Sequence, residues 1–213
     1  MASSGSFSAG QASVALTHKV VPGTASRPLS AITTDIKGSP VDSDGVTVLA
    51  APATLGSVAL REGRAHLFNA HGAELLDLPQ PFQVEYWGGL TTGWRVATDD
   101  QCSTAAVSLS DGYTLFGGTA FAASNSCVLG TSNCNTDLSA RRFNGVASNG
   151  KFNLWLKATG TGRAGSLGVT GQVADYLQYD WQGTVTHPSA KATFGIRRSS
   201  PVLIRRDIRG GRL

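Results

Sequence analysis

Alternating carboxylates are the clearest candidate for metal chemistry in this sequence. Asp42 and Asp44 are separated by one residue and are followed by Gly45. Calcium prefers oxygen ligands at this spacing, so the two carboxylates could open a calcium loop, with Asp99 and Asp100 added if the fold brings them near. The bidentate glutamate that completes such a loop is missing. A tight hairpin turn at Asp44-Gly45 explains the same residues without a metal.

Residue types for hydrolysis are present, but they form no known catalytic motif. A serine nucleophile on a strand-to-helix elbow needs Gly-x-Ser-x-Gly, which the chain does not contain. His66 and His71 would lie on opposite faces of a strand, and no further ligand is suitably spaced for zinc. Glu74, Asp77 and Glu85 could supply a glycosidase pair, but carboxylates beside a turn commonly accept turn N–H groups. We therefore expect a protein that is not an enzyme and needs no cofactor.

The chain has three cysteines, so at least one of them has no partner within the chain. Cys127 and Cys134 lie in a stretch rich in Gly, Ser and Asn, close enough in sequence for a disulfide that pins a loop. We expect this pair, with Cys102 buried or free. The alternative pairs Cys102 with one of the other two. Because there is no Cys-x-x-Cys motif, a redox or zinc-ribbon role is not expected.

Tryptophans are the residues most suited to binding a sugar or a protein surface. Trp87 and Trp94 bracket a Gly-Gly loop and are candidates for exposure. Trp155 alternates with Leu154 and Leu156, which places it on the second face of a strand. Trp155 is a ligand or interface residue if that second face is exposed, and a core residue if sheets cover both sides.

Composition and periodicity predict an all-β, mainly antiparallel fold of the β-sandwich type. The 213 residues include 26 glycines and 8 prolines, and only 15% are charged. Alternation of apolar and polar residues predicts strands near 14–20, 46–48, 82–86, 152–156, 177–181, 192–196 and 202–208. Turn pairs such as Asp111-Gly112, Asn144-Gly145 and Asn149-Gly150 punctuate these strands.

The stretch 117–135 is the natural place for a long surface loop or a seam. One division is therefore an N-terminal β lobe over 1–116 and a C-terminal β lobe over 136–213. The alternative is one continuous domain.

The net charge of +4 is concentrated at the C-terminus. Six arginines and one aspartate within residues 195–213 give +5, so the remainder of the chain sums to −1. A basic strip can contact phosphate, but arginines also keep an edge strand soluble, and we expect no nucleic-acid partner.

No stretch of about 20 apolar residues predicts a transmembrane helix. The first ten residues have no signal-peptide pattern.

Several runs resemble the C-terminal region of MshQ-type proteins. The most specific are REGRAHLFNAHGAELLDLPQPFQVEYWGG at 61–89 and TDDQC at 98–102. YLQYDW at 176–181 and HPSAKATFGIRR at 187–198 are similar to the closing strands of that family. The stretch 9–46, with Asp-x-Asp-Gly-Val, is similar to the start of the same region.

The MshQ-type family is associated with the mannose-sensitive haemagglutinin (MSHA) type IV pilus. The resemblance implies an extracytoplasmic domain of a pilus-associated surface protein that binds pilus or cell-surface components, with a role in adhesion. It carries no catalytic residues, and it favours a piece or a short relative of an exported protein whose leader is missing. The alternative function is a lectin-like carbohydrate-binding module that uses exposed tryptophans.

Overall fold

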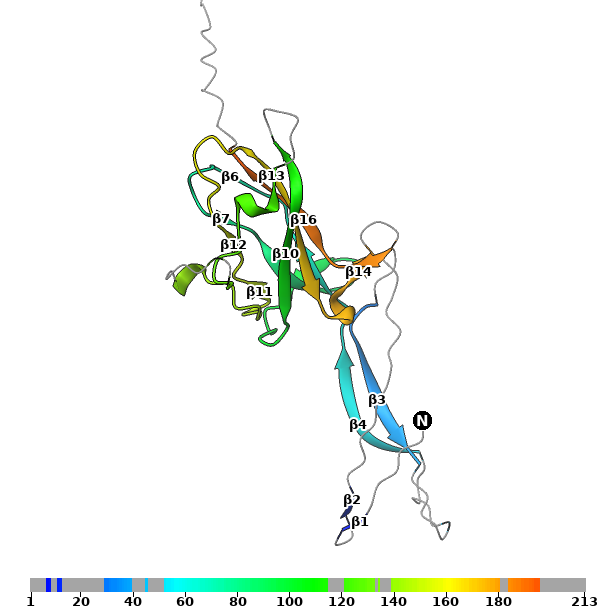
Figure 1. Ribbon diagram of the computed structural model, residues 1–213. Coiled ribbons are helices and arrows are strands. Elements are labelled where there is room, and N and C mark those ends of the chain that lie inside the picture. The colour runs from blue at the N-terminus through cyan, green and yellow to red at the C-terminus, as the bar shows by residue number, and fades with distance from the viewer. Residues whose placement is uncertain are drawn as a thin grey trace, which may run out of the picture.

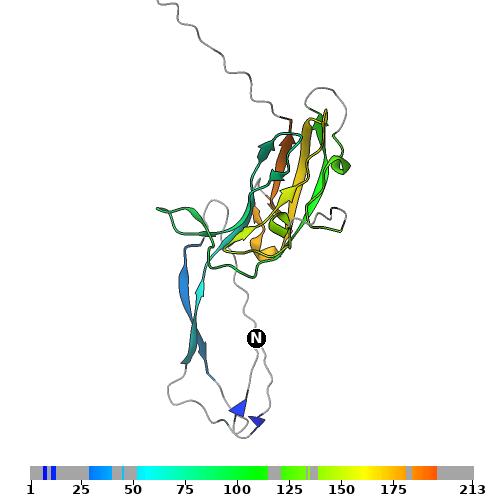
Figure 2. The ribbon, with the colours of Figure 1, turned by 90° about the vertical axis from the view of Figure 1, so that its left-hand side faces the viewer.

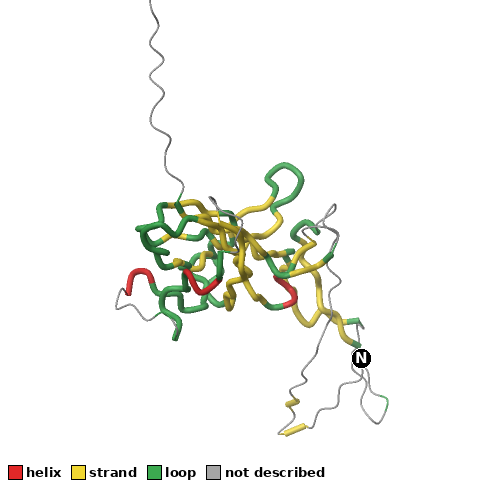
Figure 3. Tube along the Cα trace, turned by 45° about the horizontal axis from the view of Figure 1, so that its top comes forward, coloured by secondary structure: helices red, strands yellow, loops and turns green. Residues whose placement is uncertain are grey.

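The computed structural model describes residues 7–8, 11–12, 29–39, 45, 52–114, 121–132, 134, 139–180 and 184–195. The fold is all-β and mainly antiparallel, as the composition predicts. Among the described residues, helical structure is limited to three short 3₁₀ turns (Figure 3): η1 (Ala123–Asn125), η2 (Ser139–Arg141) and η3 (Asp175–Leu177). None of the described helices is long and apolar enough to cross a membrane.

The larger sheet, which we call the β13 sheet, has the strand order β10-β13-β16-β6 (Figure 1). Its strands are β6 (Ala70–Gly72), β10 (Ala105–Thr114), β13 (Gly165–Val173) and β16 (Ser189–Phe194). Strands β10 and β16 run antiparallel to β13, and β6 runs parallel to β16. Strand β10 therefore forms one edge of this sheet.

The second sheet, which we call the β8 sheet, is organised around strand β8. It contains β5 (Gly63–Leu67), β8 (Phe82–Trp87), β9 (Trp94–Val96) and β11 (Lys151–Phe152). Strand β5 pairs with β8 from Phe82 to Tyr86, whereas β11 and β9 pair with opposite ends of β8. The short strands β7 (Leu78–Pro79) and β12 (Trp155–Leu156) pair beside it.

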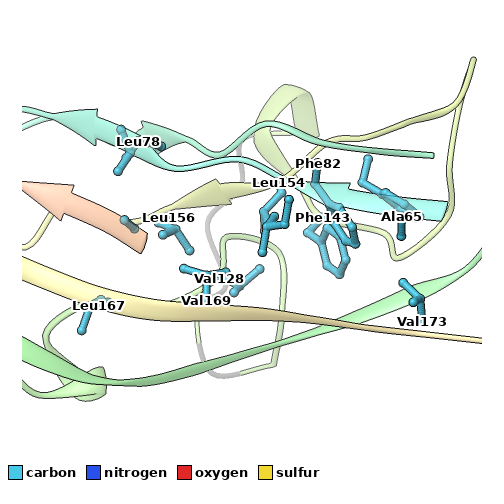
Figure 4. Packing of buried hydrophobic residues seen from close by; sticks show 14 of the residues in the cluster. Ala65, Leu78, Phe82, Val128, Phe143, Leu154, Leu156, Leu167, Val169 and Val173 are labelled. Atoms are coloured by element: carbon cyan, nitrogen blue, oxygen red, sulfur yellow. The ribbon is translucent and has the colours of Figure 1, made fainter. Parts of the chain in front are cut away.

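The hydrophobic core lies between these two sheets (Figure 4). Strands β5 and β8 contribute Ala65, Phe82 and Val84, and strand β13 contributes Leu167 and Val169 from the other sheet. Phe152, Leu154 and Leu156 are buried on one side, as their alternation predicts. The core also takes residues from within the stretch 117–135, Phe121 and Val128, and from the segment after it, Phe143.

Two further pairs of strands lie outside the sandwich. The ribbon of β3 (Ile32–Gly38) and β4 (Ala53–Leu60) projects from one end of the body (Figures 1 and 2). It leaves Ile32 and Leu55 exposed at 47% and 59%. The remaining short pairs are β1 (Phe7–Ser8) with β2 (Gln11–Ala12), and β14 (Tyr179–Asp180) with β15 (Val185–Thr186).

The sequence patterns and the strands agree in part. Predicted strands at 82–86 and 192–196 correspond to β8 and β16, whereas 152–156 is divided into β11 and β12. Asn149-Gly150 forms the expected tight turn, because both residues have positive φ and a bridge joins Ser148 to Lys151. The predicted strands at 14–20, 46–48 and 202–208 lie outside the described residues.

Two expectations are wrong. Asp111-Gly112 is not a turn between strands: β10 continues through it with a break in register between Ser110 and Tyr113, as in a β-bulge. The stretch 117–135 is not purely a surface loop, since Phe121, Val128 and Leu129 are buried. Apolar side chains at these positions are buried although the average composition of the stretch is polar.

Gly112 provides a test of this packing. A Cβ atom at residue 112 would overlap the backbone carbonyl of Ser166 on β13. We expect Gly112→Ala to lower the free energy of unfolding by about 3 kcal/mol, measured by urea denaturation with tryptophan fluorescence, because backbone cannot move aside as a side chain can.

Gly56→Ala is the matched control, because nothing lies within 4 Å of the corresponding Cβ position on β4. We expect it to change the free energy of unfolding by less than about 0.5 kcal/mol. Equal effects of the two substitutions would contradict the packing of β10 on β13.

Candidate functional site

The outer face of the β8 sheet carries a cluster of charged and aromatic side chains. Cross-strand pairs share a face, and Arg64 pairs with Glu85 while His66 pairs with Gln83. The alternate positions of the same strands, including Ala65 and Val84, point into the core. The polar members of the cluster therefore project away from the core, on strands that the core holds rigid.

Glu85 is the hub of this cluster. Its Oε2 accepts a hydrogen bond from Arg64 Nε at 2.7 Å, and its Oε1 accepts from Gln83 Nε2 at 2.7 Å and from His66 Nδ1 at 3.1 Å. The residue is only 5% exposed. Both carboxylate oxygens are thus engaged by neighbouring side chains, and the carboxylate fixes the orientation of its neighbours.

The environment of Glu85 shifts its pKa in two opposing directions. Burial raises the pKa, because it penalises the charged form, but hydrogen bonds from His66, Gln83 and Arg64, together with the charge of Arg64, lower it. The net result is a pKa of about 2, compared with an ordinary value of 4.5. Glu85 is therefore a carboxylate at any pH near neutrality.

Two aromatic rings lie against the guanidinium of Arg64. Its guanidinium carbon lies 4.1 Å from the centre of the Trp94 ring and 4.9 Å from that of Tyr179. Trp94 packs edge-to-face against both Trp87, at 5.5 Å, and Tyr179, at 5.1 Å. We call the set Arg64, His66, Gln83, Glu85, Trp87, Trp94 and Tyr179 the Arg64 face.

The structure brings two of the three candidate tryptophans together and leaves the third apart. Trp87 and Trp94 are cross-strand partners in the β8–β9 hairpin, and both are half-buried. Trp155 lies on β12, where it is half-buried and is not part of the core cluster. Its indole N–H donates to Asn153 at 2.9 Å, and Arg141 lies 5.0 Å above its ring.

The other candidate carboxylates are engaged in structural contacts. Glu74 accepts the N–H of Gly162, while Asp77 accepts that of Ala158 and forms an ion pair with Arg141. These contacts hold residues 158–162 to the segment between β6 and β7, so the carboxylates do accept backbone N–H groups, but from a distant loop.

No metal site can be built from the described part of the chain. It contains no group of three His, Cys, Asp or Glu side chains close enough to hold an ion. Asp42 and Asp44 lie outside the described residues. Asp100 accepts the backbone N–H groups of Cys102 and Ser103, so its carboxylate caps its own turn.

The expected disulfide is present. Cys127 and Cys134 are bonded, with their Cα atoms 5.7 Å apart, and Cys102 is free and exposed. The bridge closes a segment that contains the buried Val128 and Leu129. It therefore fixes a loop whose apolar residues belong to the core.

Sequence reasoning did not identify Arg64 as a site residue and treated His66 and Glu85 separately. The sequence did contain a signal for this polar face, because Arg64 and His66 are two residues apart on one strand, and Gln83 and Glu85 are two residues apart on another. Such spacing places polar groups on one face of each strand. Only the register between the strands shows that these four residues meet.

Glu85 should make the stability of the protein depend on pH. Its pKa is lower in the folded protein, so its contribution is complete above pH 5 and is lost as the pH falls toward 2. At neutral pH the contribution is about 2–3 kcal/mol after allowance for solvent screening of the charges. We expect Glu85→Gln to remove most of this pH dependence, as measured by urea unfolding at a series of pH values.

Asp99→Asn is the control, since the contact of Asp99 within the described part of the chain is an exposed ion pair with Arg61. It should leave both the stability and its pH profile nearly unchanged. Parallel pH profiles for the wild type and Glu85→Gln would show that Glu85 is not the titrating group.

Most of this chain matches one known protein family. Residues 61–208 match DUF6701, fourth domain. No curated protein matches the chain. The match begins directly after β4 ends at Leu60 and includes both the β13 sheet and the β8 sheet. The ribbon of β3 and β4 lies before the matched residues. The stretch 9–46, which also resembles MshQ-type proteins, lies before them too. Because the match covers more than half of the sequence, the chain belongs to the DUF6701 family and contains its fourth domain.

Proposed function

We propose that this chain is a non-enzymatic, extracytoplasmic β domain of an MshQ-type, pilus-associated surface protein. In this proposal it binds a protein component of the pilus or cell surface through the Arg64 face and so contributes to adhesion. The matched residues 61–208 contain the runs at 61–102 and 176–198 that resemble MshQ-type proteins. The disulfide between Cys127 and Cys134 is of a kind that forms and persists in oxidising compartments.

The observation that carries the proposal is the fixed orientation of Arg64. Glu85 holds its guanidinium against the rings of both Trp94 and Tyr179. Arginine, tryptophan and tyrosine dominate the binding energy of protein interfaces, and a side chain that is already ordered loses less entropy on binding. Such a surface is well suited to a protein partner.

The same geometry argues against acid–base catalysis at this cluster. A general base needs a free lone pair directed at a substrate proton. Both oxygens of Glu85 already accept hydrogen bonds, and its pKa of about 2 makes it a weak base near neutral pH. These features support a binding role rather than a catalytic one.

A glycan is the second candidate ligand. Apolar sugar faces stack on indole rings, while sugar hydroxyls bond to planar polar side chains. Trp87 and Trp94 contact one another on the same face as Gln83 and Arg64. This combination of rings and planar donors favours a lectin-like alternative over other small-molecule ligands.

The proposal predicts that the protein is recovered with pili and that recovery depends on Trp94. Pili sheared from the source organism should contain this chain by mass spectrometry, and deletion of the major pilin should remove it. Trp94→Ala, introduced in the full protein, should reduce its recovery by about 30-fold, the cost of losing an interface residue worth roughly 2 kcal/mol.

Trp155→Ala is the matched control, because Trp155 is also half-buried and contacts an arginine but lies outside the Arg64 face. It should leave recovery unchanged. Recovery of the chain only from soluble cytoplasm, with all cysteines reduced, would exclude the surface role. Loss of binding to a glycan array in Trp94→Ala, with pilus association intact, would favour the lectin-like alternative.

A further inference from the structure

Strand β10 has one edge that pairs with β13 and another that faces away from the sheet. At the start of the strand, Ala105 donates its N–H to Gly145 O at 2.9 Å, outside the sheet. Because backbone groups alternate in direction along a strand, those of Val107 and Leu109 also point away from β13. Among the described residues, no backbone hydrogen bond from outside the sheet reaches either residue.

The side chains of the same two residues border an open hollow. They point toward the inside of the sandwich, because their cross-strand partners Gly171 and Val169 are buried. Yet Val107 and Leu109 are only half-buried. The hollow has a volume of ≈ 730 Å³, and its lining also includes the buried Val128. The core is therefore incompletely covered along this edge.

Strand β10 lacks the usual protection of an edge between Val107 and Ser110. Proteins commonly block exposed edges with lysine, proline or a bulge. Residues 105–110 contain no charged residue and no proline, and the break in register begins only after Ser110. The edge that remains open is short and ends where the chain bulges at Asp111 and Gly112.

The charges at the hollow have one sign. Lys157 and Arg163 are the charged residues of its lining, and both are exposed. Neither forms an ion pair with another described residue. A ligand that lies along β10 therefore meets apolar side chains toward the core and positive charge at the rim.

We propose that the β10 edge binds an extended segment of a partner protein as an additional strand. Backbone groups of the segment would bond to those of Val107 and Leu109, and alternate apolar side chains would fill the hollow. An aspartate or glutamate of the segment would lie beside Lys157 and Arg163. This site is separate from the Arg64 face and does not depend on the function proposed for it.

Amide hydrogen exchange tests this directly on the ¹⁵N-labelled full chain. The probe is the synthetic peptide acetyl-Thr-Val-Thr-Val-Thr-Glu-Thr-amide, in which the two valines and one carboxylate lie on the same face of an extended strand. In the free protein, the amides of Val107 and Leu109 should exchange rapidly. Saturating peptide should slow both by at least about tenfold, because a new ladder of hydrogen bonds forms there.

Modified peptides separate strand addition from simple hydrophobic contact. N-methylation of alternate amides removes the donors on one edge of the peptide only. Methylation of the edge that faces β10 should abolish binding, whereas methylation of the opposite edge should preserve it. Equal effects of the two methylated peptides would overturn the proposal.

Charge reversal tests the acidic residue of the ligand. Lys157→Glu with Arg163→Glu should weaken binding of the glutamate peptide by about tenfold and strengthen binding of a version with lysine in that place. Lys151→Glu, a charge reversal at one exposed position on β11, is the control and should have little effect. Two results would overturn the proposal. Protection of the Val107 and Leu109 amides in the free chain would mean that another part of this chain occupies the edge. Protection that grows with protein concentration would mean that a second copy occupies it.

Discussion

The close approach of the two sheets is the constraint on which the rest of this structure depends. Phe82 of the β8 sheet packs against Gly171 of the β13 sheet so tightly that a Cβ at residue 171 would lie 2.6 Å from the phenyl ring. Gly165 leaves similar room for Phe121. Glycines weaken a strand taken alone, but here they let aromatic rings fill the space between the layers. The position of β8, and of everything on its outer face, follows from this contact.

Strand β8 joins the core to the candidate binding surface. Its inward residues, Phe82 and Val84, are buried, while Gln83 and Glu85 point outward beside β5. A charged carboxylate is costly to bury unless donors surround it, and Arg64, His66 and Gln83 supply these donors. The network also aligns Arg64 with Trp94 and Tyr179. Side chains that remain partly exposed are thereby held in fixed positions by strands of the core.

The two candidate surfaces arise from different features of the sandwich. The Arg64 face is a side-chain network on the face of a sheet, whereas the β10 edge offers backbone groups that have no partner among the described residues, beside an open hollow. One therefore suits recognition of a folded surface and the other recognition of an extended segment. The ribbon of β3 and β4 stands apart from both and precedes the matched family region.

Composition and alternation by themselves determined that the protein is all-β and that β8 and β16 are strands, and the short spacing of Cys127 and Cys134 favoured their pairing over a bridge to Cys102. These features are local, since they depend on neighbouring residues or on a short loop. The sequence patterns did not identify β10 or β13, although Val107 and Leu109 alternate with serines and Leu167 and Val169 with small or polar residues. Those strands exist because the opposite sheet fills the space that their small residues leave. Trp87 and Trp94 were identifiable as candidates, but their assembly with Arg64, Glu85 and Tyr179 was decided only by strand register and by the packing of β14, which bring residues distant in sequence onto one face.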